Sequence, residues 1–331
     1  MRVQYNTDAV RWPDRYEYYR HAAASEIAPV AIQARAPGRL RAVLSSVQAG
    51  DFLVEAASYA ADFETEFLRD DRMIRAGDPD CYRMLLNITG GEVTEQAGHQ
   101  ACFGPRDIGL FTLSSRYHNV KPARRQPMRV VMVTFPRRLL PLDEAAVTPL
   151  LGTLLPRALA GHSLLAQFLA YLADGAGPDP ETGSLAEALG QVTTALIGER
   201  LGAGSGFTPT TRRLLYQEWV RVVVARQSGD PELNPAKISR AVNISERYLH
   251  QLFRDSDQTP MQLVKATRLE HCHRDLQDPA RAAEPIGEIA SVRGYQRRDQ
   301  FARDFRQRFG IPATQLRRPS PQLPPRTGQP A

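Results

Sequence analysis

The sequence contains little cysteine. Its three cysteines, Cys81, Cys102 and Cys272, form neither a CxxC pair nor an even set. This pattern is typical of buried thiols in a reducing cytoplasm rather than of a disulfide framework.

The chain also lacks a long uninterrupted apolar run. The longest apolar stretch, Leu150–Leu172, contains Pro156, Arg157 and His162, which makes it a poor membrane span. The first twenty residues carry no apolar segment typical of a signal peptide. We therefore expect a cytoplasmic protein that does not bind a membrane.

Catalytic and metal-binding motifs are missing as well. The sequence has no P-loop, GxGxxG or GxSxG pattern. Residues 50–136 offer only His99 and His118, without the HxH spacing of a metal site. His271 and His273 flank Cys272, but residues two apart on a helix diverge by about 200°. We predict no catalytic residue, no metal and no cofactor, and hence no enzyme.

Positive charge is confined to one part of the 331-residue chain. Residues 207–331 contain 21 Lys and Arg against 13 Asp and Glu, whereas residues 1–206 contain 21 against 23. The basic excess thus lies wholly in the C-terminal part. This asymmetry favours a polyanionic partner for that part alone.

Short apolar runs separated by turn residues occupy the region from Gly50 to about Pro136, and they predict a small β-barrel or sandwich. Gly90-Gly91 predicts a hairpin. Residues 1–45 give weak signals, with a short helix at Trp12–His21. The strand candidates are Phe52–Ala57, Tyr82–Thr89, Ile108–Leu113 and Arg129–Phe135.

Two amphipathic helices are predicted after the strands, the first around Leu164–Leu172 and the second around Leu185–Leu201. Their apolar faces either pack within the chain or form a dimer seam. The candidate dimer contacts are Leu165, Phe168, Leu172, Leu189 and Leu196.

Composition divides the chain into parts. Residues 1–201 form the first predicted domain, and the Gly/Ser stretch 202–206 forms a linker. Residues 207–318 read as helical throughout. The last segment, 319–331, has five prolines and is predicted to be disordered.

The first of two helix-turn-helix patterns covers Asn234–Ser256. Asn243 lies in its turn, where a left-handed backbone is often required and Asn tolerates it. A second helix is predicted over Ser245–Ser256, with Leu249, Leu252 and Phe253 on one face. The opposite face presents Arg247, His250, Gln251 and Arg254.

The second pattern covers Pro285–Gly310, with a tight turn at Gly294. Its predicted helix, Arg297–Phe309, places three phenylalanines on one face. The other face presents Asp299, Gln300 and Arg303, and Arg298 lies at the N-terminus of the helix. A single polar helix face of this kind would be explained as solvent-exposed surface. Two such faces, each following a short helix and a turn, favour sequence-specific DNA binding.

A helix is predicted between the two patterns, at Pro260–Gln277. Its roughly 27 Å length is compatible with recognition helices in successive major grooves, about 34 Å apart.

The C-terminal residues closely resemble the AraC/XylS family of transcription regulators. This resemblance implies a bundle of about seven helices carrying two helix-turn-helix units. Two departures are mild: Ser239 stands where the family usually has Ala, and Asn243 where Gly is common. The matching segments are Ser245–Leu249, Leu252–Arg254, Pro260-Met261, Arg268-Leu269, Ile289-Ala290, Gly294-Tyr295, Phe301–Arg306 and Phe309–Pro312.

The resemblance also implies roles for individual residues. Base contacts fall to Arg247, His250 and Gln251, and to Arg298, Asp299, Gln300 and Arg303. Arg268 is expected in an internal ion pair. Residues 50–140 more weakly resemble the cupin-like sensor domain of these regulators, through Arg72–Arg75, Asp78–Tyr82, Gly104–Asp107 and Phe135–Arg137.

We therefore predict a multidomain protein, with a cupin-like β-barrel and helices followed by an all-α bundle. It is expected to be a ligand-responsive activator, nucleoid-associated and homodimeric, with promoter DNA and, as the family implies, RNA polymerase as partners. Candidate contacts to an unidentified small-molecule effector are Tyr82, Met84, Phe103 and Phe111. The alternatives are a constitutive DNA-binding protein whose first domain only dimerises or binds a partner protein and, less favoured, a cupin metalloenzyme fusion.

Overall fold

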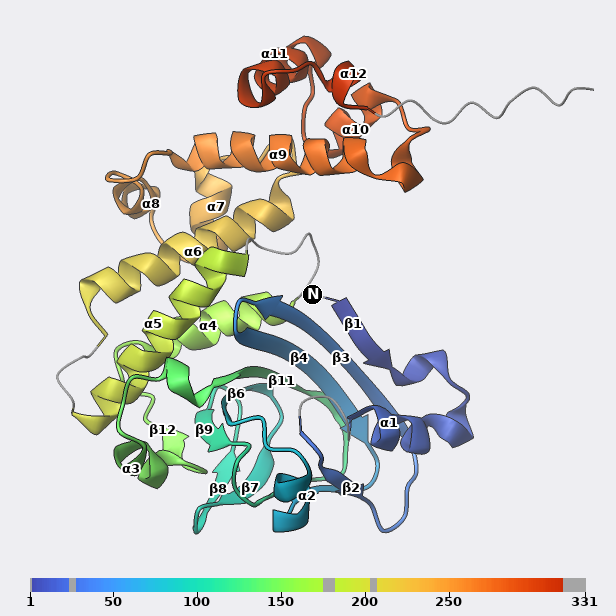
Figure 1. Cartoon of the computed structure of the whole chain (residues 1–331), viewed down its shortest axis with the longest axis vertical. Coiled ribbons are helices and arrows are strands. Elements are labelled where there is room, and N and C mark those ends of the chain that lie inside the picture. Colours follow the sequence, from blue (N-terminus) through green and yellow to red (C-terminus); the bar gives the residue numbers. More distant parts are fainter. Residues whose placement is uncertain (1, 24–27, 175–181, 203–206, 318–331) are drawn as a thin grey trace, which may run out of the picture. The chain divides into compact units, whose positions relative to one another are not determined.

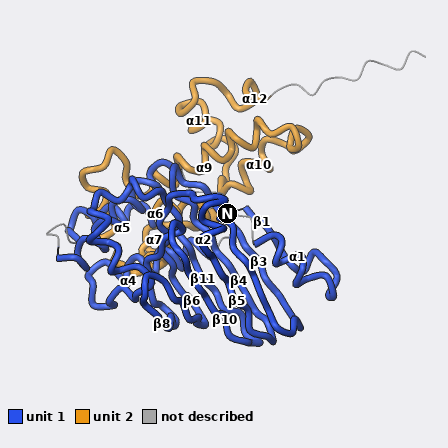
Figure 2. The backbone as a smooth tube through the Cα atoms, turned by 60° about the horizontal axis from the view of Figure 1, so that its bottom comes forward, with its two compact units in different colours: residues 1–219 blue, residues 220–331 orange. Residues whose placement is uncertain are grey.

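The computed structural model describes residues 2–23, 28–174, 182–202 and 207–317. The predicted tail and all but Gly202 of the predicted linker lie outside these residues. The chain divides into two compact units, Met1–Trp219 and Val220–Ala331 (Figure 2). This division falls within one helix, α6 (Pro209–Gln227).

The first unit contains two antiparallel sheets (Figure 1). The larger has the order β1-β3-β4-β11-β6-β9-β12, and the smaller β2-β5-β10-β7-β8. The larger sheet consists of β1 (Arg2–Asn6), β3 (Leu40–Ala49), β4 (Phe52–Ala61), β11 (Arg124–Pro136), β6 (Cys81–Thr89), β9 (Ile108–Thr112) and β12 (Leu154–Leu155). The smaller consists of β2 (Ala31–Gln33), β5 (Thr65–Arg69), β10 (Tyr117–Lys121), β7 (Glu92–Gln96) and β8 (His99–Phe103).

The four predicted strands are confirmed, but the hairpin at Gly90-Gly91 is wrong. β6 and β7 flank this turn, yet they belong to different sheets, so the glycines carry the chain from one sheet to the other. Gly90 has φ +85°, which favours glycine. β1, β2 and the first part of β3 were not predicted, because they lie in residues 1–45, where the sequence signals are weak.

Helices of the first unit precede, interrupt and follow the strands: α1 (Arg15–Ala23), α2 (Asp71–Ala76), α3 (Glu144–Val147), α4 (His162–Ala173) and α5 (Thr182–Leu201). α4 contacts β4, β6 and β11, and α5 contacts β3.

The five candidate dimer residues on α4 and α5 are buried within the single chain, each exposing 1% or less of its surface. A seam on these helices would therefore use their other side chains. The dimer itself stays a prediction.

Seven α-helices are described from Pro209 onward. The apolar residues predicted to face inward on α6, Leu215, Trp219, Val222 and Val223, are buried. The other helices are α7 (Pro235–Ala241), α8 (Glu246–Leu252), α9 (Pro260–Gln277), α10 (Ile286–Val292), α11 (Arg298–Phe309) and α12 (Ala313–Leu316).

α9 is the 18-residue helix predicted between the two patterns. Thr259 caps it through a reciprocal capping box with Gln262, which satisfies two otherwise unpaired backbone N–H groups. Leu269, Cys272 and Leu276 on its second half join one core with Ile289, Tyr295, Phe301 and Phe305. In Figure 1, α7 and α8 lie near the start of α9, and α10–α12 lie along its other side.

Gly294 and Gly310 allow a matched test of this packing. Both have positive φ, +88° and +75°. A Cβ at Gly294 would lie 2.6 Å from the Ser228 carbonyl oxygen and 2.8 Å from Arg268 Nε, whereas nothing lies within 4 Å at Gly310. We expect Gly310→Ala to cost about 1–2 kcal/mol of unfolding free energy and Gly294→Ala clearly more. Equal losses in chemical denaturation would contradict the close approach.

Candidate DNA interface and effector cavity

The first candidate recognition helix is α8. Asn243 in the preceding turn adopts φ +56°, the left-handed conformation predicted for it. The Ser245 hydroxyl oxygen then accepts a hydrogen bond from the Tyr248 N–H at 3.2 Å, which fixes where the helix begins. Leu249 and Leu252 are buried. The predicted base contacts Arg247, His250 and Gln251 are exposed on the same short helix.

α8 ends at Leu252, four residues before the predicted end. Arg254 therefore lies in the turn after the helix, and the helical spacing assumed for it is wrong. Its side chain is exposed, so its role in DNA binding stays a prediction. Helical periodicity alone did not reveal the end, because Leu252 and Phe253 continue the apolar pattern and both are buried.

The second candidate recognition helix is α11. Phe301 and Phe305 are buried and Phe309 packs beside them, which confirms the predicted core face. Arg298, Asp299, Gln300 and Arg303 are exposed. They occupy the first two turns, the part of a recognition helix that meets base edges in this motif.

Asp299 organises the start of α11. Its carboxylate accepts hydrogen bonds from Arg297 at 3.2 and 2.8 Å and lies 3.6 Å from Arg303. The hydrogen bond from Arg297 holds the pKa of Asp299 below its ordinary value, so the group is a carboxylate at neutral pH. Arginine and glutamine can form paired hydrogen bonds to guanine and adenine, and a carboxylate accepts from cytosine.

Arg268 on α9 supports both the end of α6 and the turn before α11. Its guanidinium donates to the carbonyl oxygens of Ser228 at 2.8 Å and Asp230 at 2.7 Å. The expected internal ion pair of Arg268 is therefore wrong, although the residue is structural. Gly294 passes close to the same guanidinium, and only a residue without a side chain fits there.

Ser239, the other departure from the family pattern, is buried on α7. Its hydroxyl donates to the Ala236 carbonyl oxygen at 3.1 Å. A buried hydroxyl without a partner would lower the stability by about 1–3 kcal/mol, and this hydrogen bond avoids that loss.

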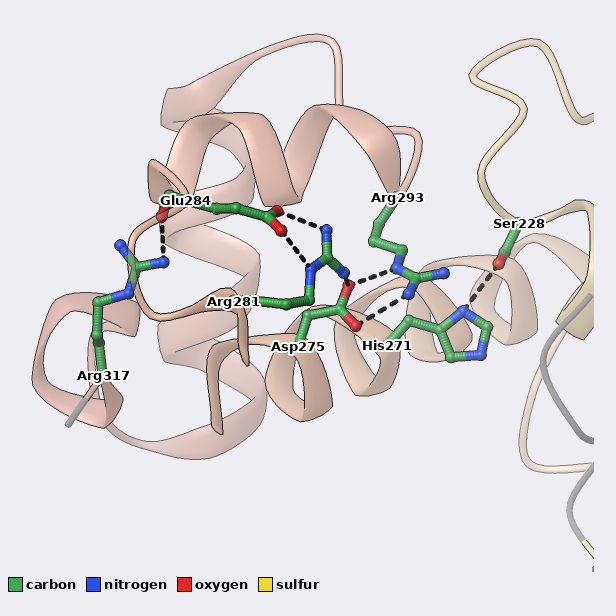
Figure 3. A network of polar contacts seen from close by, with 7 residues as sticks. All are labelled: Ser228, His271, Asp275, Arg281, Glu284, Arg293 and Arg317. Atoms are coloured by element: carbon green, nitrogen blue, oxygen red, sulfur yellow. Dashed lines mark hydrogen bonds and ion pairs between the residues drawn. The ribbon is translucent and has the colours of Figure 1, made fainter. Parts of the chain in front are cut away.

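A polar network joins the second half of α9 to the second helix-turn-helix (Figure 3). Arg293 binds the Asp275 carboxylate through two hydrogen bonds, at 2.6 and 2.9 Å, and Arg281 pairs with it at 2.6 Å. Arg281 in turn pairs with Glu284. Burial raises the pKa of Asp275, but the two arginines outweigh it and the net pKa is lowered.

His271 lies one turn earlier on α9, where its Nδ1 is 3.1 Å from the Ser228 hydroxyl (Figure 3). Burial, with the nearby Arg293 charge, lowers the pKa of His271 to about 4. His273 instead packs against Phe309, with ring centroids 4.5 Å apart and the rings tilted by 33°. The two histidines diverge as predicted, and no group of three His, Cys, Asp or Glu side chains suited to a metal occurs within the described ranges.

The first unit contains a cavity of about 140 Å³, lined by residues of both sheets. Aromatic rings form much of its wall, and β7 and β10 contribute a polar side. The pKa of Tyr59, which contacts the Thr65 hydroxyl, is raised to about 12 by burial. The polar lining residues are Ser58, Arg83, Glu92, Thr94, Tyr117, Asn119 and Lys121.

Of the four candidate effector contacts, only Phe111 lines this cavity. Phe103 packs against Phe111 with ring centroids 5.4 Å apart, and Met84 is buried outside the lining. Tyr82 faces a separate surface cavity, with its ring 5.4 Å from Arg137 Cζ.

On β6 it is Arg83 and Leu85 that face the cavity, so the predicted residues Tyr82 and Met84 lie on the opposite face of the strand. Polar residues at alternate positions of β7 and β10 were the signal that could have revealed the lining.

Comparisons with known proteins agree with this arrangement. A family model described as an AraC-binding-like domain matches residues 19–201, more than half of the chain. The chain belongs to the AraC family of transcription regulators. A second model, a helix-turn-helix domain, matches residues 238–319 of this AraC-family chain. These matches confirm three predictions: the family resemblance, the cupin-like fold and a function as a DNA-binding transcription regulator.

The individual proteins that match this AraC-family chain share little sequence identity with it. The probable thc operon regulatory protein of Rhodococcus erythropolis is 34% identical over 87 residues, so the match spans about a quarter of each protein. The AraC-like transcriptional activator CuxR is 18% identical, with a TM-score of 0.45 over 83% of this chain and 95% of that one. A DNA-binding transcriptional dual regulator from Escherichia coli K-12 is 20% identical, with a TM-score of 0.28 over 30% of this chain and 90% of that one.

Within the described residues, no helix is long and apolar enough to cross a membrane.

The buried His271 predicts a pH dependence of stability. In the unfolded chain histidine has its ordinary pKa of 6.5, whereas the folded protein holds it near 4. The folded state resists protonation, so stability falls as pH drops from about 6.5 towards 4, by up to about 3 kcal/mol. Denaturation of His271→Gln should lack this part of the slope, while the exposed control His250→Gln should keep it. Identical slopes in both variants would show that His271 does not couple to folding.

Proposed function

We propose that the chain is an effector-responsive transcription activator that reads two adjacent major grooves. The observation that carries the proposal is the pair of exposed polar faces on α8 and α11, one before and one after α9 in the chain. Each face combines arginine with a hydrogen-bonding amide, and each follows a turn held by a positive-φ residue.

Effector responsiveness is supported by the partly polar cavity of the first unit. A ligand that binds this cavity with different affinity in the DNA-binding and non-binding states would shift the balance between them. We propose a homodimer and RNA polymerase as further partners, because the AraC family uses both. No catalytic role is proposed.

If α8 and α11 each contact bases, single substitutions in the two helices should change the sequence preference at different operator positions. Arg247→Ala and Arg303→Ala should each weaken operator binding by about 1–3 kcal/mol and relax the sequence preference at one position. The two affected positions should lie about one helical turn of DNA apart. Arg274→Ala, an exposed arginine of α9, is the matched charge control and should leave the preference unchanged.

Binding to a randomised operator library at fixed salt measures these preferences. Unchanged preferences in both recognition-helix variants would contradict the base-reading role. Operator affinity that no small molecule alters would favour the constitutive alternative.

A further inference from the structure

The cavity of the first unit contains charged groups that the protein itself does not satisfy. Glu92 exposes only 4% of its surface, and its Oε1 has no hydrogen-bond partner. A buried polar atom without a partner requires an explanation, and a bound water, ion or ligand is one. An unpaired buried group lowers the stability of the fold. A ligand that donates a hydrogen bond to Glu92 would recover this free energy, which would add to its affinity.

Lys121 supplies the opposite charge. Its ammonium lies over the rings of Phe67 and Tyr59, at 4.5 and 5.3 Å from their centroids. It forms no ion pair with any carboxylate of the described residues, and it is the one lysine of residues 1–219. Burial lowers the pKa of Lys121, and the Glu92 carboxylate only partly offsets this effect. An anion bound beside Lys121 would restore its charged form.

The register of the small sheet makes Lys121 and Glu92 neighbours on one face of the sheet. β10 pairs antiparallel with β7, with Val120 opposite Val93 and Asn119 opposite Thr94. Lys121 and Glu92 therefore come next in register, as cross-strand neighbours. Such pairs have Cβ atoms about 5 Å apart. A ligand whose anionic group and hydrogen-bond donor lie close together would be able to contact both side chains.

The other cation of the cavity is already engaged. Arg83 pairs with Glu55 at 3.1 Å and donates to the Thr134 hydroxyl at 2.9 Å. Asn119 donates to the Thr94 hydroxyl at 2.8 Å. Lys121 and Glu92 are thus the charged groups of the lining left for a ligand.

The volume limits the rest of the ligand. About 140 Å³ is close to the roughly 150 Å³ cavity that holds one benzene molecule. Phe67, Tyr59 and Phe111 offer apolar and aromatic surface around it. A ring or a short branched chain fits this space.

We propose that this cavity binds a small carboxylic acid that carries an N–H or O–H donor next to its carboxylate, on an aromatic or branched aliphatic body. The carboxylate contacts Lys121, and the donor contacts Glu92. The inference rests on the proposed effector-responsive function, and it names the chemical class of the effector.

Calorimetric titration of the full-length protein tests this inference. The probes are 2-aminobenzoate, 2-hydroxybenzoate and leucine. The controls are 4-aminobenzoate, which moves the donor away, and aniline, which lacks the carboxylate. We expect at least one probe to bind tenfold or more tightly than both controls. Lys121→Met should weaken that binding at least tenfold, and Lys237→Met, at a lysine of the second unit, should not.

If Lys121→Met fails to fold, Glu92→Gln is a second variant that keeps the shape of the cavity. It should reduce the preference for the 2-substituted over the 4-substituted isomer. Binding of benzoate, which has no such donor, should stay unchanged. Binding by no probe, or equal binding of the 2- and 4-substituted isomers, overturns the inference. Operator affinity of the ligand-free protein, measured in parallel, separates this failure from failure of the proposed DNA-binding function.

Discussion

The second unit depends on the hydrogen bonds that Arg268 donates from the middle of α9 to the carbonyl oxygens of Ser228 and Asp230. Because a guanidinium has a fixed, planar set of donors, it can hold two backbone groups at once. Gly294 closes against the same site, so the turn that precedes α11 is positioned by the helix that separates the two motifs. Asp275 with Arg293 and Arg281 repeats this design one to two turns further along α9.

The first unit follows a different principle. Its sheets retain charged groups among their buried residues. Glu55 and Arg83 satisfy one another, whereas Lys121 and Glu92 do not form an ion pair. Charges that are buried without a full set of partners reduce stability. A bound ligand that pairs with Lys121 and Glu92 would remove this loss of stability. We therefore assign ligand recognition to these two side chains rather than to the apolar wall of the cavity.

Sequence periodicity predicted the helical half well, because its helices have one buried and one exposed face. Asn243, Gly294 and α9 lie where the pattern placed them. It failed for the end of α8, where Phe253 stays buried beyond the helix, and for the partners of Arg268, which are backbone atoms. In the barrel, both faces of β6 are covered, so alternation did not distinguish the cavity face from the core face. A shift of one residue exchanges the two faces, and this explains the selection of Tyr82 and Met84 in place of Arg83 and Leu85.

We propose that α9 fixes the spacing of the two candidate recognition helices. This proposal is tested most directly by measuring the affinity of the full-length protein for operators with five base pairs inserted between the two contacted segments. A half-turn insertion rotates one segment to the opposite side of the DNA. We predict that binding falls to the level of unrelated DNA. Affinity that is unchanged by the insertion would contradict a fixed spacing.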